Sequence, residues 1–330
     1  MDRSGRAGAG RLSAAAPGVG PAPAVEPIGG LAAACAPLLP RCRFPAPGTS
    51  VTCAVSGGAD SISLLALAVA SGCEPTAVHV DHGLRPGSAA EADVVAAAAS
   101  RLGAGFRAER VQVAPGGNLE ARARAARHAV LPGDVLFGHT ADDQAETVLL
   151  NLLRGAGVEG LAGIRADDRH PILAVRRHET RTLCERLGIE TVSDPSNDDP
   201  RHRRNRVRAE VLPLLDDVAE RDLVPVLARQ AALLREVADL LVAQAELLDP
   251  TDVRMLVAAP PALARVAVRR WLRGCDPDDH PPDAATVERV LAVARGDAAA
   301  TDVGASWRVA RTAGRLRLEP PADSHGRRAH

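Results

Sequence analysis

The sequence contains no lysine, so all 40 of its Lys/Arg positive charges are arginines. A Schiff-base lysine, a lysine general base and the lysine of a Walker-A phosphate loop are therefore excluded. Any phosphate group that this protein binds must be met by arginine, by backbone N–H groups or by a metal ion. The net charge of -1 gives no hint of a nucleic acid by itself, so any such hint must come from the distribution of the charges.

Cysteine pairs and aromatic residues are also scarce. The six cysteines are scattered and none stands in a Cys-x-x-Cys pair, which argues against a disulfide framework and against a cysteine-based zinc or iron–sulfur site. Aromatic residues make up 2% of the chain, so the core must be built from leucine, valine, isoleucine and alanine. No apolar run reaches the roughly eighteen residues of a membrane-spanning helix, and we therefore expect no membrane span.

Length and composition predict how the chain is divided. A length of 330 residues exceeds what one core usually needs and predicts two domains. We place the first at 29–215 and a smaller one at 216–320. Residues 1–28 are rich in glycine, alanine and proline and lack a leucine-rich stretch, which favours a disordered tail over a signal peptide. Residues 321–330 are interpreted as a second disordered tail, and the protein is expected to stay in the cytoplasm.

Apolar runs typical of strands alternate with helical patterns in the first domain. The predicted strands are 51–55, 76–80, 106–113, 134–138 and 190–193, and the predicted helices are 62–70, 89–102, 119–129 and 179–187. This alternation predicts an α/β fold with a parallel sheet. Beyond residue 213 the pattern becomes mainly helical. The elements expected there are helices at 224–248, 253–273 and 284–294 and a small hairpin at 306–318, with Gly314 in its turn.

Three polar clusters follow three of the predicted strands, at 56–61, 81–85 and 139–146. Because ligands bind at the carboxyl edge of an open parallel sheet, all three clusters are expected to face one crevice. The first is Ser56-Gly57-Gly58-Ala59-Asp60-Ser61. Its glycines and the following helix start suit a pyrophosphate group, and Asp60 suits a Mg²⁺ ion that bridges to it. The alternative is an ordinary strand-to-helix turn with a polar cap.

The cluster at 139–146 combines a histidine with three acids. Asp142, Asp143 and Glu146 lie at the start of a predicted helix, where acids could simply favour the helix dipole. Asp142 and Asp143 project in different directions, so one can cap the helix while the other reaches the crevice. His139, at the strand end, is a candidate for contacting phosphate or moving a proton, with a structural histidine as the alternative.

Arginines are concentrated in two places. Arg124 and Arg127 share one face of a predicted helix, either as phosphate ligands or as part of a solvated surface. The strip 201–208 holds five arginines and no acid, which is typical of a phosphate-binding footprint, with a surface charge run or a linker as the alternative. Its candidate phosphate-binding residues are Arg204, Asn205, Arg206 and Arg208.

Together these motifs closely resemble those of tRNA(Ile)-lysidine synthases, in order from about residue 50 to 215. The matching segments are the 56–61 hexapeptide, His79-Val80-Asp81-His82-Gly83-Leu84-Arg85, His139-x-x-Asp-Asp-Gln-x-Glu, 154–157 with 160–163, and 194–197 leading to 204–208. The hexapeptide is shared by many ATP-pyrophosphatases. The Asp-His-Gly-Leu-Arg and Arg-Asn-x-Val-Arg blocks are more specific.

The resemblance implies a PP-loop ATPase domain (adenine nucleotide α-hydrolase-like), a smaller, mainly helical C-terminal domain that binds tRNA, and a ligase that forms carbon–nitrogen bonds. ATP would adenylate the C2 oxygen of the wobble cytidine in a tRNA(Ile) with a CAU anticodon, and the amino group of free L-lysine would then displace AMP. The resemblance implies catalytic roles for Asp60, Arg124, His139, Asp143 and Arg208. It also implies tRNA binding by Arg204, Asn205, Arg206 and Arg208. It further implies a Mg²⁺ on Asp60 and Asp143, a role for Asp143 in orienting or deprotonating lysine, and it allows a homodimer.

Three other functions compete with this interpretation. A tRNA thiolase of the same fold usually needs a Cys-x-x-Cys pair, which is absent here. A catalytically silent RNA-binding protein would not need the acids Asp60, Asp142 and Asp143 or the arginine Arg124. A small-molecule amide ligase, such as an NAD or asparagine synthetase, would share the loop but would not need the arginine strip.

Overall fold

The computed structural model describes residues 30–81, 88–111, 122, 130–192, 199–274, 282–304 and 307–320. The chain forms two compact units: unit 1 comprises Met1–Glu146 and Ala166–Glu220, and unit 2 comprises Thr147–Arg165 and Arg221–His330. The segment Thr147–Arg165 thus packs with unit 2, although it falls inside the first predicted domain. The predicted domain boundaries themselves stay a prediction.

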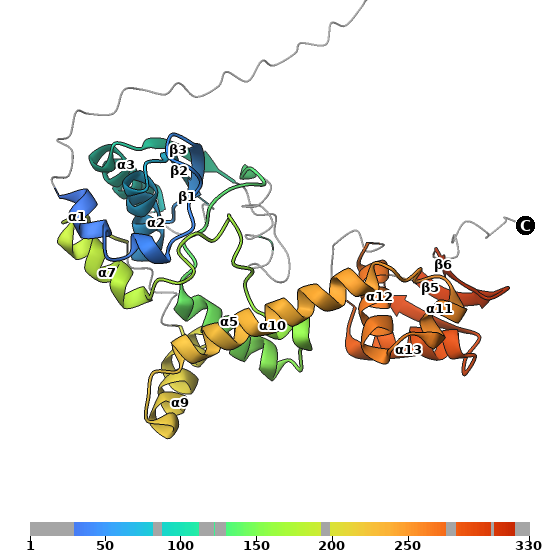
Figure 1. Cartoon of the computed structure of the whole chain (residues 1–330). Coiled ribbons are helices and arrows are strands. Elements are labelled where there is room, and N and C mark those ends of the chain that lie inside the picture. The colour runs from blue at the N-terminus through green and yellow to red at the C-terminus, as the bar shows by residue number, and fades with distance from the viewer. Residues whose placement is uncertain are drawn as a thin grey trace, which may run out of the picture. The chain divides into compact units, whose positions relative to one another are not determined.

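Unit 1 is built on a parallel sheet in the order β1-β2-β3, which confirms the predicted α/β class. Its strands are β1 (Ser50–Ala54), β2 (Glu74–Asp81) and β3 (Gly105–Arg110) (Figure 1). The register places Cys53 opposite Ala77 and Ala77 opposite Phe106. Parallel pairing brings the carboxyl ends of β1 and β2 to the same edge, where the 56–61 loop leaves the sheet.

Two of the predicted strands were wrong: the first is reduced to a single bridge, and the described part of the second forms no strand. Residues 134–138 contribute only a parallel bridge between Leu136 and Cys53, because the next amide, Phe137 N, donates to Arg169 O at 2.8 Å and not to β1. Leu136 still exchanges hydrogen bonds with β1, so its segment runs beside that strand. Residues 190–192 form no strand; Val192 N donates to Gly57 O at 2.9 Å instead.

Helix α2 lies at the centre of the packing in unit 1, and its burial explains its almost uninterrupted apolar sequence. Residues Ile62, Leu64, Leu65 and Leu67 of α2 are fully buried. α2 packs against α1, α3 and α7. The helices of unit 1 are α1 (Leu31–Cys35), η1 (Leu39–Arg41), α2 (Ala59–Ala70), α3 (Ser88–Leu102), α7 (Arg177–Arg186), α8 (Arg203–Arg206), η3 (Val207–Val211) and α9 (Leu212–Ala219). Helix α5 (Ala141–Leu153) begins in unit 1, and its residues from Thr147 on belong to unit 2. Apart from Arg122, the predicted helix 119–129 lies outside the described residues.

Unit 2 is mainly helical, with a small antiparallel sheet. Its helices are α6 (Val158–Leu161), α10 (Val224–Ala245), α11 (Val253–Ala258), α12 (Pro261–Arg273) and α13 (Ala284–Arg295). The continuous helix predicted at 253–273 is broken in two. Ala259 is extended, with ψ 151°, because it precedes Pro260, and the residue before a proline is driven out of the helical region. Pro261 then opens α12, where its missing N–H costs nothing.

The predicted hairpin is confirmed as β5 (Trp307–Thr312) and β6 (Arg315–Glu319). Its turn residues Ala313 and Gly314 have φ 49° and 76°, the left-handed pair typical of two-residue hairpin turns. A third strand, β4 (Ala300–Gly304), pairs with β5 and was not predicted. Within the residues that the structure describes, no helix combines the length and apolarity needed to cross a membrane.

Candidate active site

The 56–61 loop connects β1 to α2 and is closed by its own serines. Ser56 N donates to Ser61 Oγ at 3.2 Å, and Ser61 Oγ donates to Gly58 O at 2.9 Å. Gly58 is the N-cap of α2, and Asp60 lies in the first turn of that helix. The loop therefore presents a helix N-terminus and backbone amides at the carboxyl edge of the sheet, the arrangement that binds oxyanions.

Gly57 is required by the backbone of this loop. Its φ is +92°, a left-handed value, and a Cβ atom there would lie 2.7 Å from Val192 Cγ2. The same residue accepts the hydrogen bond from Val192 N, so the loop is held against the segment that follows α7. Gly58, by contrast, has φ -70°, and a Cβ there would meet only Ser56 Oγ at 3.7 Å within 4 Å.

We therefore expect Gly57→Ala to destabilise unit 1 by about 1–3 kcal/mol, from left-handed strain and the contact with Val192. Gly58→Ala is the matched control and is expected to change stability by less than about 1 kcal/mol, since its backbone suits any residue. Urea unfolding followed by circular dichroism measures both variants. Equal unfolding midpoints would contradict the strain attributed to Gly57.

A second glycine brings the 139–146 cluster to this loop. A Cβ on Gly138 would lie 2.8 Å from Asp60 O and 3.1 Å from Ser61 Cα. The end of the 134–138 segment therefore touches the backbone of the first turn of α2, and only glycine permits so close an approach. As a result, α5 begins beside Asp60.

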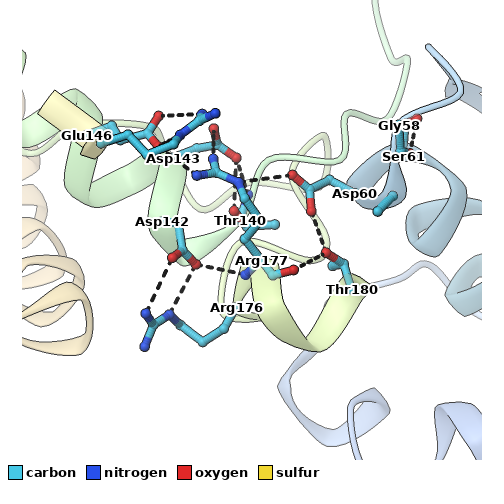
Figure 2. Close-up of polar contacts among 12 residues, drawn as sticks. Gly58, Asp60, Ser61, Thr140, Asp142, Asp143, Glu146, Arg176, Arg177 and Thr180 are labelled. Carbon is cyan, nitrogen blue, oxygen red and sulfur yellow. Dashed lines mark hydrogen bonds and ion pairs between the residues drawn. The ribbon is translucent and has the colours of Figure 1, made fainter. Parts of the chain in front are cut away.

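Arg177, the first residue of α7, joins the loop to α5. Its Nε lies 3.4 Å from Asp60 Oδ2, its Nη2 donates to Asp143 Oδ1 at 2.9 Å, and its Nη1 donates to Glu146 Oε1 at 2.7 Å. Figure 2 shows this guanidinium between Asp60 on one side and the two acids of α5 on the other. One side chain, 12% exposed, therefore ties three carboxylates together.

Glu146 is the most deeply buried member of the cluster, with a side chain that is 0% exposed. Besides Arg177, it accepts hydrogen bonds from Arg204 Nε at 2.9 Å and from Arg208 Nε at 2.8 Å. A buried carboxylate is tolerated only when it is paired and hydrogen-bonded, and three guanidinium groups meet that requirement here. Glu146 is thus the point at which the arginine strip meets the polar edge of the sheet.

We expected one of the neighbouring acids Asp142 and Asp143 to cap the helix and the other to reach the crevice. The structure shows a different arrangement. Asp143 does both, since its Oδ2 accepts from Thr140 N and Thr140 Oγ1 at 2.9 Å while its Oδ1 binds Arg177. Asp142 accepts from Arg176 Nε at 3.1 Å and from Arg177 N at 2.8 Å. It therefore fixes the start of α7 (Figure 2).

The pKa values of Asp60 and Asp143 are shifted in opposite directions. Burial raises the pKa of Asp60, and the nearby charge of Asp143 adds to the rise, against hydrogen bonds from Thr180 and Arg177. Burial alone would also raise the pKa of Asp143, but the Arg177 guanidinium and the Thr140 amide outweigh it and hold this pKa below its usual range. Despite its burial, the pKa of Arg177 is raised by Asp143 and Glu146, so it stays charged.

Two family models match this chain: one described as a PP-loop domain matches residues 38–215, and one described as the TilS substrate binding domain matches residues 252–317. The tRNA(Ile)-lysidine synthase of Nocardia farcinica is 45% identical over 70% of this chain and 77% of that protein. Proteins of the same name from Rhodococcus erythropolis and Mycolicibacterium paratuberculosis are 43% and 46% identical, covering 68% and 66% of this chain and 74% and 73% of those proteins.

This chain belongs to the tRNA(Ile)-lysidine synthase family. The family resemblance and the PP-loop fold expected from the sequence are confirmed. The assignment of roles to individual residues stays a prediction, and the structure places those residues as follows.

Among the predicted catalytic residues of this family member, Asp60, Asp143 and Arg208 lie in the network of Arg177 and Glu146. His139 lies in an aromatic stack, with ring centroids 5.7 Å from Phe137 and 5.0 Å from His170. It is also close enough to help lower the pKa of Asp143, after the larger effects of burial, Arg177 and Thr140. Arg124 lies outside the described residues.

The side chains of the predicted tRNA-binding strip do not all face the same way. Arg204 and Arg208 face inward to Glu146. Asn205 donates its side-chain amide to Asp199 O at 2.9 Å. Arg206 faces solvent and pairs with Glu210 at 2.8 Å. Arg208 lies in η3, a single π turn, and such turns are frequent at functional sites.

Sequence reasoning missed Arg176, Arg177 and Thr180, although Thr180 Oγ1 donates to Asp60 and Arg177 binds three acids. One signal could have found the arginines. Positive side chains are unfavourable at a helix N-terminus, so two adjacent arginines there suggest acidic partners elsewhere in the fold. Nothing in the sequence says which acids those are.

The Mg²⁺ predicted on Asp60 and Asp143 does not fit between these side chains as they stand. The Arg177 guanidinium, 3.4 Å from Asp60 and 2.9 Å from Asp143, occupies that place, and a divalent cation there would face a like charge. Within the described part of the chain, no group of three or more His, Cys, Asp or Glu side chains could hold a metal ion. A metal on these two carboxylates stays a prediction that requires Arg177 to move.

Proposed function

We propose that this chain ligates L-lysine to C2 of the wobble cytidine of tRNA(Ile) with a CAU anticodon, through an adenylated cytidine, with release of pyrophosphate and AMP. The product reads AUA in place of AUG. The observation that carries this proposal is that the arginine strip and the 56–61 loop converge on one acid cluster, since Glu146 binds both Arg208 and the Arg177 that contacts Asp60. Groups suited to an RNA phosphate thereby stand beside groups suited to ATP.

The first step is supported by the loop. The C2 carbonyl oxygen of cytidine is a poor leaving group, and attaching AMP to it makes it a good one. Pyrophosphate departs with growing negative charge, which amides of the 56–61 loop and the α2 N-terminus would stabilise. In the absence of any lysine, Arg124 and Arg208 are the proposed partners of the α-phosphate. Mg²⁺ is proposed as the counter-ion that enters with ATP.

The second step requires a lysine amino group that has lost its proton. Burial opposes ionisation of Asp143, but Arg177 and Thr140 nevertheless hold the pKa of this residue low, which makes it a weak base and a persistent anion. The low pKa therefore favours a role for Asp143 in orienting the lysine ammonium, and disfavours a role in removing its proton.

Binding of the tRNA is proposed to use both parts of the chain. Arg204, Asn205, Arg206 and Arg208 supply contacts near the reacting base. Residues 216–320 supply a further tRNA-binding region, in line with the match of residues 252–317 to a substrate binding domain. The homodimer that the resemblance allows stays a prediction.

The test is incorporation of radiolabelled lysine. Purified protein with ATP, Mg²⁺, labelled lysine and a CAU-anticodon tRNA(Ile) transcript is expected to label the tRNA. A transcript with uridine at the wobble position is the matched control and should stay unlabelled, because it lacks the cytidine. Absence of label with tRNA binding retained would support the catalytically silent RNA-binding protein instead.

A further inference from the structure

Three acids at the carboxyl edge of the sheet share the guanidinium of Arg177, and one of them, Glu146, also pairs with Arg204 and Arg208. Asp60, Asp143 and Glu146 come from two different elements, α2 and α5, and Arg177 of α7 contacts all three. The side chain of Arg177 is 12% exposed, and those of Asp60 and Asp143 are 27% and 13% exposed. Like charges at such exposure repel one another strongly, so the arrangement depends on the cation between them.

The backbone of Arg177 is fixed independently of this contact. Its N–H donates to Asp142 Oδ2 at 2.8 Å, and Arg176 N donates to Glu179 Oε2 at 2.8 Å, which is one half of a capping box at the start of α7. Glu179 is itself held by Arg41 at 2.6 Å. The start of the helix therefore places Arg177 between the loop and α5 by contacts that do not involve its guanidinium.

We infer that Arg177 is a positioning residue that occupies the place between Asp60 and Asp143 in the protein without nucleotide and so keeps divalent cations out of it. The guanidinium supplies the positive charge that a bridging metal would supply. A cation can enter only when Arg177 leaves these two carboxylates, and Glu146 retains it on the other side through the 2.7 Å contact. A divalent cation would then enter this place only with the phosphates of ATP, and the free protein would hold none there.

This inference deepens the proposed function, because it assumes that the loop binds ATP, but the Mn²⁺ measurement that tests it needs no tRNA, lysine or ATP. The probe is Mn²⁺, whose free concentration is read by electron paramagnetic resonance in solutions of the full chain. Wild type is expected to bind weakly, without saturating. Arg177→Gln leaves Asp60 and Asp143 facing each other and is expected to bind Mn²⁺ at least about tenfold more tightly, since a neighbouring unit charge outweighs that factor.

Two matched variants separate this role from a general loss of charge. Arg176→Gln removes a guanidinium one residue away that bonds Asp142, and Mn²⁺ binding is expected to stay at the wild-type level. Arg177→Gln combined with Asp143→Asn is expected to lose the gain. Arg177→Lys keeps the positive charge and is expected to keep Mn²⁺ out. A lysine ammonium cannot bridge three acids as a guanidinium does. The turnover number of lysidine formation should therefore fall, with little change in the KM for ATP.

Tight Mn²⁺ binding by the wild-type chain would overturn the inference, and this measurement stands even if Arg177→Gln fails to fold. An equal gain in Arg176→Gln and Arg177→Gln would also overturn it. A chain that formed no lysidine but showed the expected Mn²⁺ pattern would contradict the proposed function and leave the role of Arg177 supported.

Discussion

Glu146→Ala is expected to lower the free energy of unfolding of unit 1 by about 3–5 kcal/mol, the usual cost of removing one partner from a buried ion pair. Glu146 is 0% exposed and receives guanidinium groups from Arg177, Arg204 and Arg208. Removing the carboxylate leaves these cations close together without their shared anion. Repulsion among them then adds to the loss of the hydrogen bonds.

Glu210→Ala is the matched control, because it also deletes a glutamate paired with an arginine of the strip. Glu210 is 51% exposed, and exposed pairs contribute about 0–1 kcal/mol. Urea unfolding of both variants, followed by circular dichroism, gives the comparison. If Glu146→Ala proved as stable as Glu210→Ala, the buried network would contribute little and the arginines would find other partners or water.

The general fold could be predicted because strand and helix alternation is a local signal. Apolar runs marked β1 and β2 within a few residues, and the change to a helical pattern marked the start of α10. The two strands at 134–138 and 190–193 were wrongly predicted because their backbone amides donate to residues far away in the sequence. Phe137 N bonds Arg169 O and Val192 N bonds Gly57 O, and neither partner can be read from the surrounding sequence. The break at Pro260 was readable, since two prolines interrupt the pattern there.

The site was predictable as an edge of the sheet but not as a set of contacts. Strand ends located Asp60 and Asp143 near each other. The partner that joins them, Arg177, lies 34 residues beyond Asp143 and 117 beyond Asp60. Arginines are common in this chain, and only tertiary packing selects this one. The arginine strip shows the same limit, because its composition indicated phosphate binding while the fold turned Arg204 and Arg208 toward Glu146.

Arg208→Ala is expected to lower kcat/KM for lysine incorporation by about 10²–10³, the range typical for loss of one group that stabilises charge in a transition state. Arg208 binds Glu146 through Nε at 2.8 Å and Nη2 at 3.3 Å, and its side chain is 32% exposed, so it can reach a substrate phosphate while anchored. ATP affinity should change little if its partner is the adenylate formed on tRNA. Arg208→Lys should recover part of the rate, since it keeps the charge without the planar fork.

Arg206→Ala distinguishes this role from simple tRNA binding. Arg206 is 59% exposed and pairs with Glu210 at the surface. If it contacts a tRNA phosphate, its loss should weaken tRNA binding and reduce the slope of log affinity against log salt by about 1, with the rate at saturating tRNA preserved. Arg208→Ala should show the opposite pattern, with a reduced rate at saturating tRNA. A loss of ATP affinity alone in Arg208→Ala would assign this arginine to the nucleotide site. If the slope of log tRNA affinity against log salt were the same for both variants and wild type, the strip would not be part of the tRNA interface.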